Sequence, residues 1–343
     1  MAIKQPRLCA GIVVTGSCTI SILVGATPYT VTITPGTYWL DPICSGIVAA
    51  GTLDALGIFT NLLDTADTGG TYTCAYSAPF NDGEINSFAS SITRSAATFS
   101  IRGSNAATNA AGRRFLRFLG FDALADATAA ITLTSKIAPA IWDPLRGEDK
   151  SPEEDPSGYG VVVQTENGTA YGADIGDPLY RRLVSFPGLK MSSVKRNNSA
   201  ILTSAQWANF ESVMWPWLSN VNPVRYWADK NATQNTYLAA AMTAADITFT
   251  TPVVSAYAND TMICVDGEWM EVHSGFGTTT TTVYRDKPVA HGKYAPVSTD
   301  FVGTYLMDNS GGNVNQGGFK PERRSESDPR FDMTIALIRT TGV

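Results

Sequence analysis

Charged residues and histidine are scarce in this chain, and each shortage excludes a class of protein. Only 16% of the 343 residues are charged and the formal net charge is −6, so the chain offers no broad basic surface for nucleic acid. Two histidines, His273 and His291, argue against a histidine-dependent catalytic triad. No apolar run reaches the roughly 18–20 residues of a membrane-spanning helix. We also expect no signal peptide, because Thr15, Gly16 and Ser17 break the first apolar stretch.

Cysteine usage gives little support to a zinc site. The chain has an odd number of cysteines and no CxxC pair: Cys9, Cys18, Cys44, Cys74 and Cys264. We expect reduced and mostly buried thiols, since cysteine is among the residues most often buried. The alternative is a pair that oxidises outside the cell, and Cys9 and Cys18 are its best candidates because they flank a predicted turn.

The motifs of the common enzyme classes are absent. The chain has no GxSxG, no HExxH, no phosphate-binding loop with its lysine and no dinucleotide fingerprint. We therefore predict no catalytic residues, no cofactor and no metal, and a structural or binding role. Paired carboxylates of a glycan-cleaving enzyme stay open, because no sequence signature marks them.

Short β-prone segments alternate with turn residues along most of the chain. Residues 8–41, 71–76, 98–102, 160–164, 183–186 and 263–272 carry strand patterns. Helical spacing of apolar residues occurs at 46–64, at 106–119 with Gly120 as C-cap, and at 204–219 after a capping-box pattern. The expected fold is mainly β with a few helices (α+β), built from β-sandwich or barrel-like modules.

An acidic, proline-containing segment suggests a domain boundary. Residues 147–159 hold five acids and two prolines with little apolar material, which is typical of a solvated linker or loop. We predict an N-terminal α+β domain at 1–146. We predict a C-terminal β-rich domain at 160–343, with its helix near 204–219.

The densest aromatic region lies in this second part. It contains the candidates for glycan or partner contact: Trp215, Trp217, Arg225, Tyr226 and Trp227. A core anchor is the simpler interpretation, and exposed rings would favour a sugar-stacking surface. The burial of the indoles decides between them.

Asp266 and Gly267 stand between two apolar runs, which predicts a hairpin with a type I′ turn. Aspartate suits this turn through its own backbone hydrogen bonding. We therefore assign no catalytic role to Asp266 or Glu268. From the sequence alone, Asp266→Asn and Glu268→Gln are each expected to leave the fold nearly intact.

Residues 246–307 contain the turn Asp266-Gly267-Glu268, followed by the threonines 278–282, Arg285 and His291-Gly292. This order resembles a small β module of tailed-bacteriophage virion proteins. In that module a strand pair around an acidic-Gly-Glu turn leads to a Thr/Val strand, an Arg-containing turn and a His-Gly turn. Asp286 replaces the glycine that usually follows the arginine. Residues 30–39 and 118–121 also look like parts of phage tail-associated proteins.

The resemblance implies a structural subunit of a tailed-phage virion, in the tail, neck or baseplate, assembled in the host cytoplasm. It carries no catalytic residues over. Expected partners are other copies of the chain in a ring or multimer and other virion proteins, with no membrane and no sequence-specific nucleic acid. The alternatives are a receptor- or glycan-binding tail protein, a glycan-cleaving tail enzyme, and a non-viral adhesin.

Overall fold

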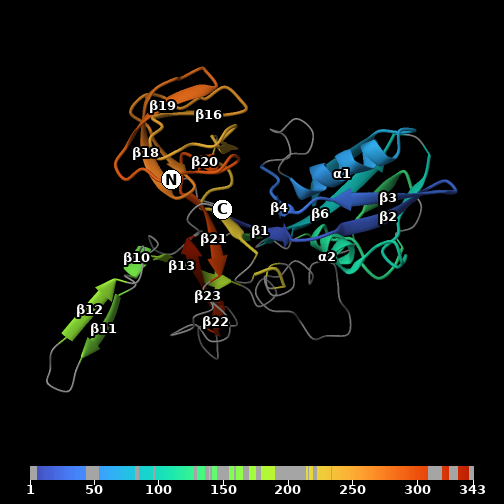
Figure 1. The fold of residues 1–343 in the computed structure, drawn as a ribbon, viewed down its shortest axis with the longest axis horizontal. Coiled ribbons are helices and arrows are strands. Elements are labelled where there is room, and N and C mark those ends of the chain that lie inside the picture. The colour runs from blue at the N-terminus through green and yellow to red at the C-terminus, as the bar shows by residue number, and fades with distance from the viewer. Residues whose placement is uncertain are drawn as a thin grey trace.

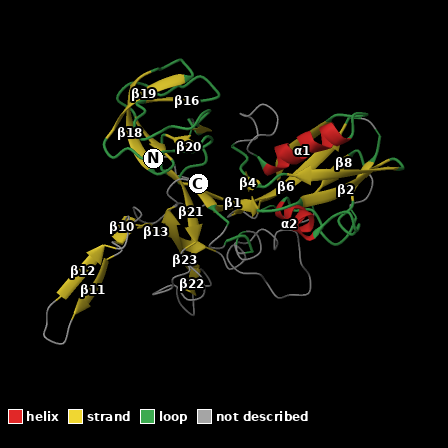
Figure 2. Ribbon diagram, in the orientation of Figure 1, coloured by secondary structure: helices red, strands yellow, loops and turns green. Residues whose placement is uncertain are grey.

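The computed structural model shows a mainly β chain with two helices among the residues it describes (Figures 1 and 2). It describes residues 6–43, 54–81, 85–95, 97–126, 130–135, 139, 141–144, 154–157, 160–164, 170–174, 179–189, 214, 216–218, 222–232, 234–307, 319–323 and 331–339. The predicted fold class is confirmed. Within these residues no helix is both long and apolar enough to cross a membrane.

The largest sheet has twelve strands and combines distant parts of the chain. Its members are β1 (Arg7–Val14), β4 (Gly36–Trp39), β5 (Tyr72–Asn81), β6 (Ile85–Arg94), β8 (Thr132–Thr134), β9 (Ile141–Pro144), β10 (Glu154–Ser157), β13 (Leu179–Leu189), β14 (Val224–Trp227), β21 (Val302–Met307), β22 (Phe319–Arg323) and β23 (Phe331–Arg339). Nine of them follow the order β10-β13-β23-β21-β14-β1-β9-β6-β5.

This sheet does not respect the predicted domain boundary. β1 pairs antiparallel with β14, from Arg7 opposite Trp227 to Ala10 opposite Val224. Strands from both sides of residues 147–159 therefore share one hydrogen-bonded sheet. Composition could not reveal this, because the pairing joins residues more than 200 positions apart.

The acidic segment is also more ordered than a linker where it is described. Glu154–Ser157 forms β10 and pairs with β13, with Glu154 opposite Arg182 and Asp155 opposite Arg181. The described end of the acidic segment is therefore a strand and not a loop. Most of the predicted helix at 204–219 lies outside the described residues, and its described residues, Met214 and 216–218, lie in turns or irregular structure.

Both helices belong to the N-terminal part, where they flank the strands (Figure 2). They are α1 (Ala55–Ala66) and α2 (Ala110–Phe118), beside the three-stranded sheet β3 (Thr27–Ile33), β2 (Cys18–Val24) and β7 (Phe99–Ile101). The Asn109 side chain caps α2 by accepting from the backbone N–H of Gly112 at 2.8 Å. Leu119 is the C-cap and Gly120 follows it with φ of 86°, so the predicted helix end at this glycine is confirmed.

Cys9, Cys18 and Cys74 of this part are thiols. Cys9 and Cys18 are both buried and are not joined to each other. Burial raises the pKa of Cys18 to about 11. The Cys9–Cys18 disulfide considered from the sequence is therefore not formed, whereas the expectation of buried thiols holds for both.

Residues 236–298 form a curved six-stranded sheet, hereafter the half-barrel (Figure 1, orange). Its strands are β15 (Thr236–Tyr237), β16 (Thr248–Thr250), β17 (Met262–Val265), β18 (Glu268–Ser274), β19 (Thr280–Arg285) and β20 (Pro296–Ser298), in the order β15-β20-β17-β18-β19-β16. The N–H of Ala239 donates to the carbonyl of Thr250 at 2.7 Å and links the two ends. The half-barrel thus encloses a hydrophobic cluster of its own, which includes Phe249, Ile263 and Met270. A separate hairpin consists of β11 (Gly160–Gln164) and β12 (Ala170–Asp174).

Candidate functional site

The turn between β17 and β18 places Glu268 inside the half-barrel. Asp266 and Gly267 have φ of 44° and 84°, as a type I′ turn requires, so the predicted hairpin is confirmed. Side chains alternate along a strand, and Glu268, Met270 and Val272 are buried while Trp269, Glu271 and His273 are exposed. Glu268 is therefore a carboxylate on the core side of the sheet.

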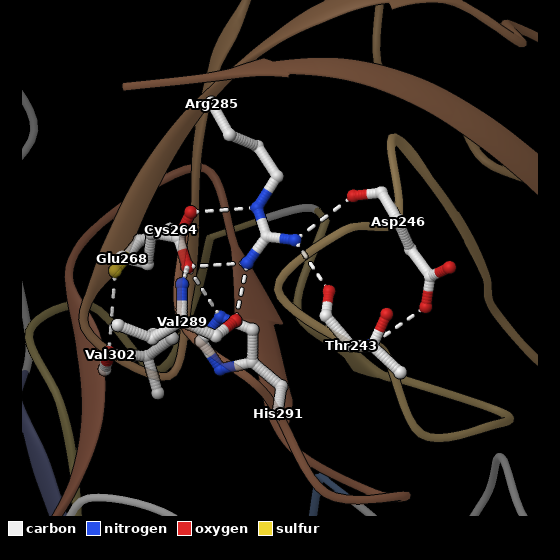
Figure 3. Close-up of polar contacts among 8 residues, drawn as sticks. All are labelled: Thr243, Asp246, Cys264, Glu268, Arg285, Val289, His291 and Val302. Carbon is white, nitrogen blue, oxygen red and sulfur yellow. Dashed lines mark hydrogen bonds and ion pairs between the residues drawn. The ribbon is translucent and has the colours of Figure 1, made fainter. Parts of the chain in front are cut away.

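Arg285, at the end of β19, meets this carboxylate in a bidentate ion pair. Its Nε donates to Glu268 Oε1 and its Nη2 to Oε2, both at 2.8 Å. Nη1 donates to the carbonyls of Thr243 and Asp246 at 2.8 and 2.9 Å, and Nη2 donates a second bond to the carbonyl of Val289. All five N–H groups of the guanidinium therefore have acceptors. Figure 3 shows the guanidinium between Glu268 and the 243–246 turn.

Glu268 is equally well supplied with donors. Its Oε2 lies 2.8 Å from His291 Nε2 and accepts from the backbone N–H of Val289 at 3.1 Å (Figure 3). The side chains of all three residues of this Glu268–Arg285–His291 cluster are at least nine-tenths buried. Such a cluster is stabilising only when every charge is paired and hydrogen-bonded, and here both ionic groups meet that condition.

The electrostatics of the cluster favour an ionised carboxylate. Burial alone would raise the pKa of Glu268, but hydrogen bonds from Arg285, His291 and Val289, with the arginine charge, lower it to about 2. A carboxyl group with this pKa is not a proton donor near neutral pH. The guanidinium has no N–H left for a substrate either. The geometry is that of a structural clasp that holds three loops of the half-barrel together.

The aromatic candidates from the sequence are core residues. Trp217, Arg225, Tyr226 and Trp227 are exposed by 7%, 2%, 0% and 0%. Trp215 lies outside the described residues. Four of the five proposed glycan or partner contacts therefore have no surface to offer, because the three residues from β14 lie within the large sheet and Trp217 packs edge-on against Phe118 at 5.1 Å.

Asp41 explains the burial of the arginine among these residues. Its Oδ2 receives Arg225 Nη1 at 3.2 Å, Trp227 Nε1 at 3.1 Å and the Tyr237 hydroxyl at 2.6 Å. The Arg225 guanidinium also lies 4.3 Å from the Trp39 ring centroid. A buried carboxylate thus connects the chain after β4 to β14 and to the half-barrel.

Sequence reasoning missed Glu268 as a core residue because it assigned the whole Asp-Gly-Glu stretch to the turn. The alternation itself contained the signal. Glu268 shares the parity of Met270 and Val272, so an inward carboxylate in need of a partner follows from the period of two. The sequence-based expectation for Glu268→Gln assumed an exposed turn residue, and the buried contacts of Glu268 lead us to expect a loss of stability instead.

Among the residues that the structure describes, no group of three or more His, Cys, Asp or Glu side chains could hold a metal ion. No known protein-family model matches the chain, and no curated protein does. The resemblance to phage virion modules therefore depends on the residues of this chain alone.

Proposed function

We propose that the chain is a structural subunit of a tailed-bacteriophage virion, in its tail, neck or baseplate, where copies of it assemble into a multimer. The observation that carries the proposal is the clasp. The residues that carry the resemblance, Glu268, Arg285 and His291, are separate in sequence and meet in one buried cluster. The buried cluster supports the interpretation that these residues stabilise a β module. A stable module suits a structural component of a virus particle.

A surface for neighbouring copies lies on the outer face of the same sheet. Met262, Trp269 and Tyr284 are exposed by 49%, 44% and 57%. The exposed His273 packs against Tyr284 with ring centroids 4.7 Å apart and the ring planes tilted by 55°. We name these four residues the outer strip. They belong to three adjacent strands, and the pairings of Met262 and Tyr284 with Glu271 place them on one face.

The composition of the outer strip fits a protein partner. Tryptophan, tyrosine and methionine are enriched at protein interfaces, and clustered exposed apolar side chains are uncommon on monomers. A second copy would cover the strip from the outside, while the clasp holds the sheet from the inside. The low charge of the chain limits repulsion between packed copies.

The location of the chain tests the virion role directly. Particles of the virus that encodes the chain should contain it, as detected by mass spectrometry and located by cryo-electron microscopy at a tail, neck or baseplate position with several copies. Its absence from purified particles would overturn the proposal.

The interface is tested separately by light scattering. The wild-type chain should form a multimer, and replacing both Trp269 and Tyr284 by serine should shift it toward the monomer. The matched control is Leu124→Ser, because Leu124 is 80% exposed and lies outside the outer strip. A double variant that assembles like wild type would exclude the outer strip as the contact surface.

A further inference from the structure

Three large apolar side chains are exposed at one end of the half-barrel. Val253 and Val254 lie in the loop after β16, and Phe276 lies in the turn between β18 and β19. Their exposed fractions are 46%, 61% and 65%. We name these three residues the apolar tip. Single exposed apolar side chains are ordinary on a protein surface, whereas a group of them marks an interaction site.

Backbone hydrogen bonds join the two loops that carry the apolar tip. The N–H of Ser255 donates to the carbonyl of Thr278 at 2.6 Å, and the N–H of Gly277 donates to the carbonyl of Ser255 at 2.9 Å. Val254 and Phe276 are each one residue before a partner in these bonds. The backbones of the apolar tip therefore lie next to each other and form one surface.

The apolar tip is remote from the attachment of the half-barrel to the large sheet. β18 begins after the Asp266 turn, which is hydrogen-bonded to Thr304 of β21. It ends at Ser274, about 20 Å further along the strand, and the turn with Phe276 follows. The last residue of β16 pairs with the first residue of β19, so the loop after β16 is at the same end. Figure 1 shows the half-barrel extending away from β21.

The two loops and the strands beside them have no charge. Residues 247–259 and 274–284 contain no Asp, Glu, Lys, Arg or His. The other exposed residues of the loops are small or uncharged: Pro252, Ala256, Ala258, Asn259, Gly277 and the threonines 278–280. An occupant recognised through its charge would find no counterion in these loops.

Polar groups of the loops are engaged within the protein. The Thr278 hydroxyl lies 2.9 Å from the carbonyl oxygen of Gly275 and 2.6 Å from that of Thr280. The Thr251 hydroxyl donates to the carbonyl of Val253 at 2.7 Å. A loop can enter an apolar medium when its polar groups are hydrogen-bonded internally, because the medium offers no partner. These groups already have their partners inside the half-barrel.

This chemistry favours a lipid bilayer over a protein as the occupant. Protein interfaces are enriched in tyrosine, tryptophan, methionine and arginine, which describes the outer strip and not the apolar tip. Proteins that lie on a membrane bury apolar side chains at the boundary between headgroups and acyl chains. Their affinity comes from the buried apolar area and from attraction to anionic lipids. Without charge, the apolar tip has only the first contribution.

We propose that the apolar tip inserts into the surface layer of a neutral lipid bilayer. Val253, Val254 and Phe276 enter the acyl chains, and the exposed threonines 278–280 lie among the headgroups. The inference is independent of the outer strip and of the virion role. The sequence-based expectation of no membrane partner considered membrane-spanning segments, whereas the apolar tip lies on the membrane and does not cross it.

The test is cosedimentation of the full chain with phosphatidylcholine vesicles. The bound fraction should rise saturably with lipid concentration. Vesicles that also contain phosphatidylserine should bind the chain no more tightly, and added salt should not release it, because no charge of the loops contributes. Absence of binding to phosphatidylcholine, or binding that requires phosphatidylserine, would overturn the proposal.

Two double variants assign the binding to the apolar tip. Val254→Ser with Phe276→Ser should lower the partition coefficient at least tenfold, since it removes most of the apolar surface. The control is Leu124→Ser with Ile131→Ser, because Leu124 and Ile131 are 80% and 55% exposed and lie outside the half-barrel. Both double variants should keep the wild-type denaturation midpoint, as all four side chains are exposed. Wild-type binding by the tip variant, or equal losses in both variants, would refute the assignment.

Light scattering without lipid distinguishes a second copy as the occupant. The tip variant should have the same molar mass as wild type, because the outer strip is unchanged. A shift of the tip variant toward the monomer would assign the apolar tip to a contact between copies and would overturn the lipid proposal.

Discussion

The carboxylate of Asp266 accepts a hydrogen bond of 2.7 Å from the backbone N–H of Thr304, 38 residues further along the chain. Asp266 is in the β17–β18 turn, whereas Thr304 is in β21 of the twelve-stranded sheet. Two residues earlier, the Cys264 thiol lies 3.3 Å from the carbonyl of Val302. The hairpin is thus attached to the large sheet, and the turn residue has a second role besides its backbone conformation.

Because of this contact, we expect two substitutions at Asp266 to differ in their effect on stability. Asp266→Asn should change the free energy of unfolding by less than about 0.5 kcal/mol, because asparagine tolerates the positive φ and its amide oxygen can accept from Thr304. Asp266→Ala should destabilise the chain by about 1–3 kcal/mol, because the buried Thr304 N–H loses its acceptor. Urea denaturation of the two variants measures the difference. Equal stabilities would mean that the Thr304 contact contributes nothing.

Removing the charge of Glu268 should be far more damaging. Glu268→Gln leaves the buried guanidinium of Arg285 without its counterion, and breaking such a pair from one side costs about 3–5 kcal/mol. Glu271→Gln is the matched control, since Glu271 is on the same strand and faces solvent. Denaturation midpoints of both variants test this, and similar small losses would contradict a structural clasp.

The same ion pair predicts an acid-dependent stability. The pKa of Glu268 is about 2 in the folded chain against an ordinary value of 4.5, so the folded state favours the ionised form. Its contribution is present above about pH 4.5 and is lost as the pH falls toward 2. The stability difference between wild type and Glu268→Gln should shrink across this window. A difference that stays constant from pH 7 to pH 2 would exclude the linkage.

Local sequence patterns predicted which residues form helices and strands better than they predicted which strands pair. The β-branched runs at 11–14 and 18–24 are strands, and the apolar stripe of Leu56, Phe59 and Leu63 is the buried face of α1. The pairing of β1 with β14 was inaccessible, because the period of a strand specifies which face is buried and not which strand lies beside it. For that reason the sequence could not show that strands from both sides of residues 147–159 share one sheet.

The same contrast holds for the candidate sites: features set by neighbouring residues were predicted, and contacts between distant residues were not. The Asp266–Gly267 turn is a local signal and was predicted. Glu268 and Arg285 belong to strands whose register brings them together, so the clasp could not be read from spacing. The aromatic region was recognised as dense, yet the partner of its buried Arg225 is Asp41, which lies 184 residues away in sequence.

The close contact between α2 and β2 predicts the sign of the stability change for Gly112→Ala. Packing predicts a loss of stability, whereas helix propensity predicts a gain. A Cβ at Gly112 would lie 2.0 Å from the carbonyl oxygen of Thr19, so helix and strand would have to move apart. Gly112→Ala should destabilise the fold by about 1–3 kcal/mol. Propensity alone would make alanine more favourable by about 1 kcal/mol.

Gly16→Ala is the matched control for this substitution, because a Cβ there would meet nothing within 4 Å. It should change the stability by less than about 0.5 kcal/mol. Thermal or urea unfolding measures both variants. A stabilised Gly112→Ala chain would show that the helix does not approach β2 as closely as described.

Asp54 gives the opposite pH dependence to Glu268. It caps α1 by accepting from the Gly57 N–H at 3.0 Å, and it also accepts from the Tyr76 hydroxyl. Burial raises its pKa from 3.8 to about 7, against the lowering effect of these hydrogen bonds and with a small further rise from Asp41. The folded state therefore retains a proton that the unfolded state loses. Stability is full below about pH 3.8 and is lost as the pH rises toward 7.

Asp54→Asn should remove this loss, because asparagine is as good an N-cap as aspartate and has no charge to bury. Between pH 4 and pH 7 the wild type should lose up to about 1.4 kcal/mol per pH unit relative to the variant. The measurement is a set of urea unfolding curves for both chains at half-unit steps of pH. Below pH 4 the unfolding free energies of wild type and variant should converge, because the Asp54 carboxyl group is then protonated in both the folded and the unfolded state. Parallel curves across the whole range would mean that Asp54 titrates alike in the folded and unfolded chain, and the buried cap would then have to be hydrated.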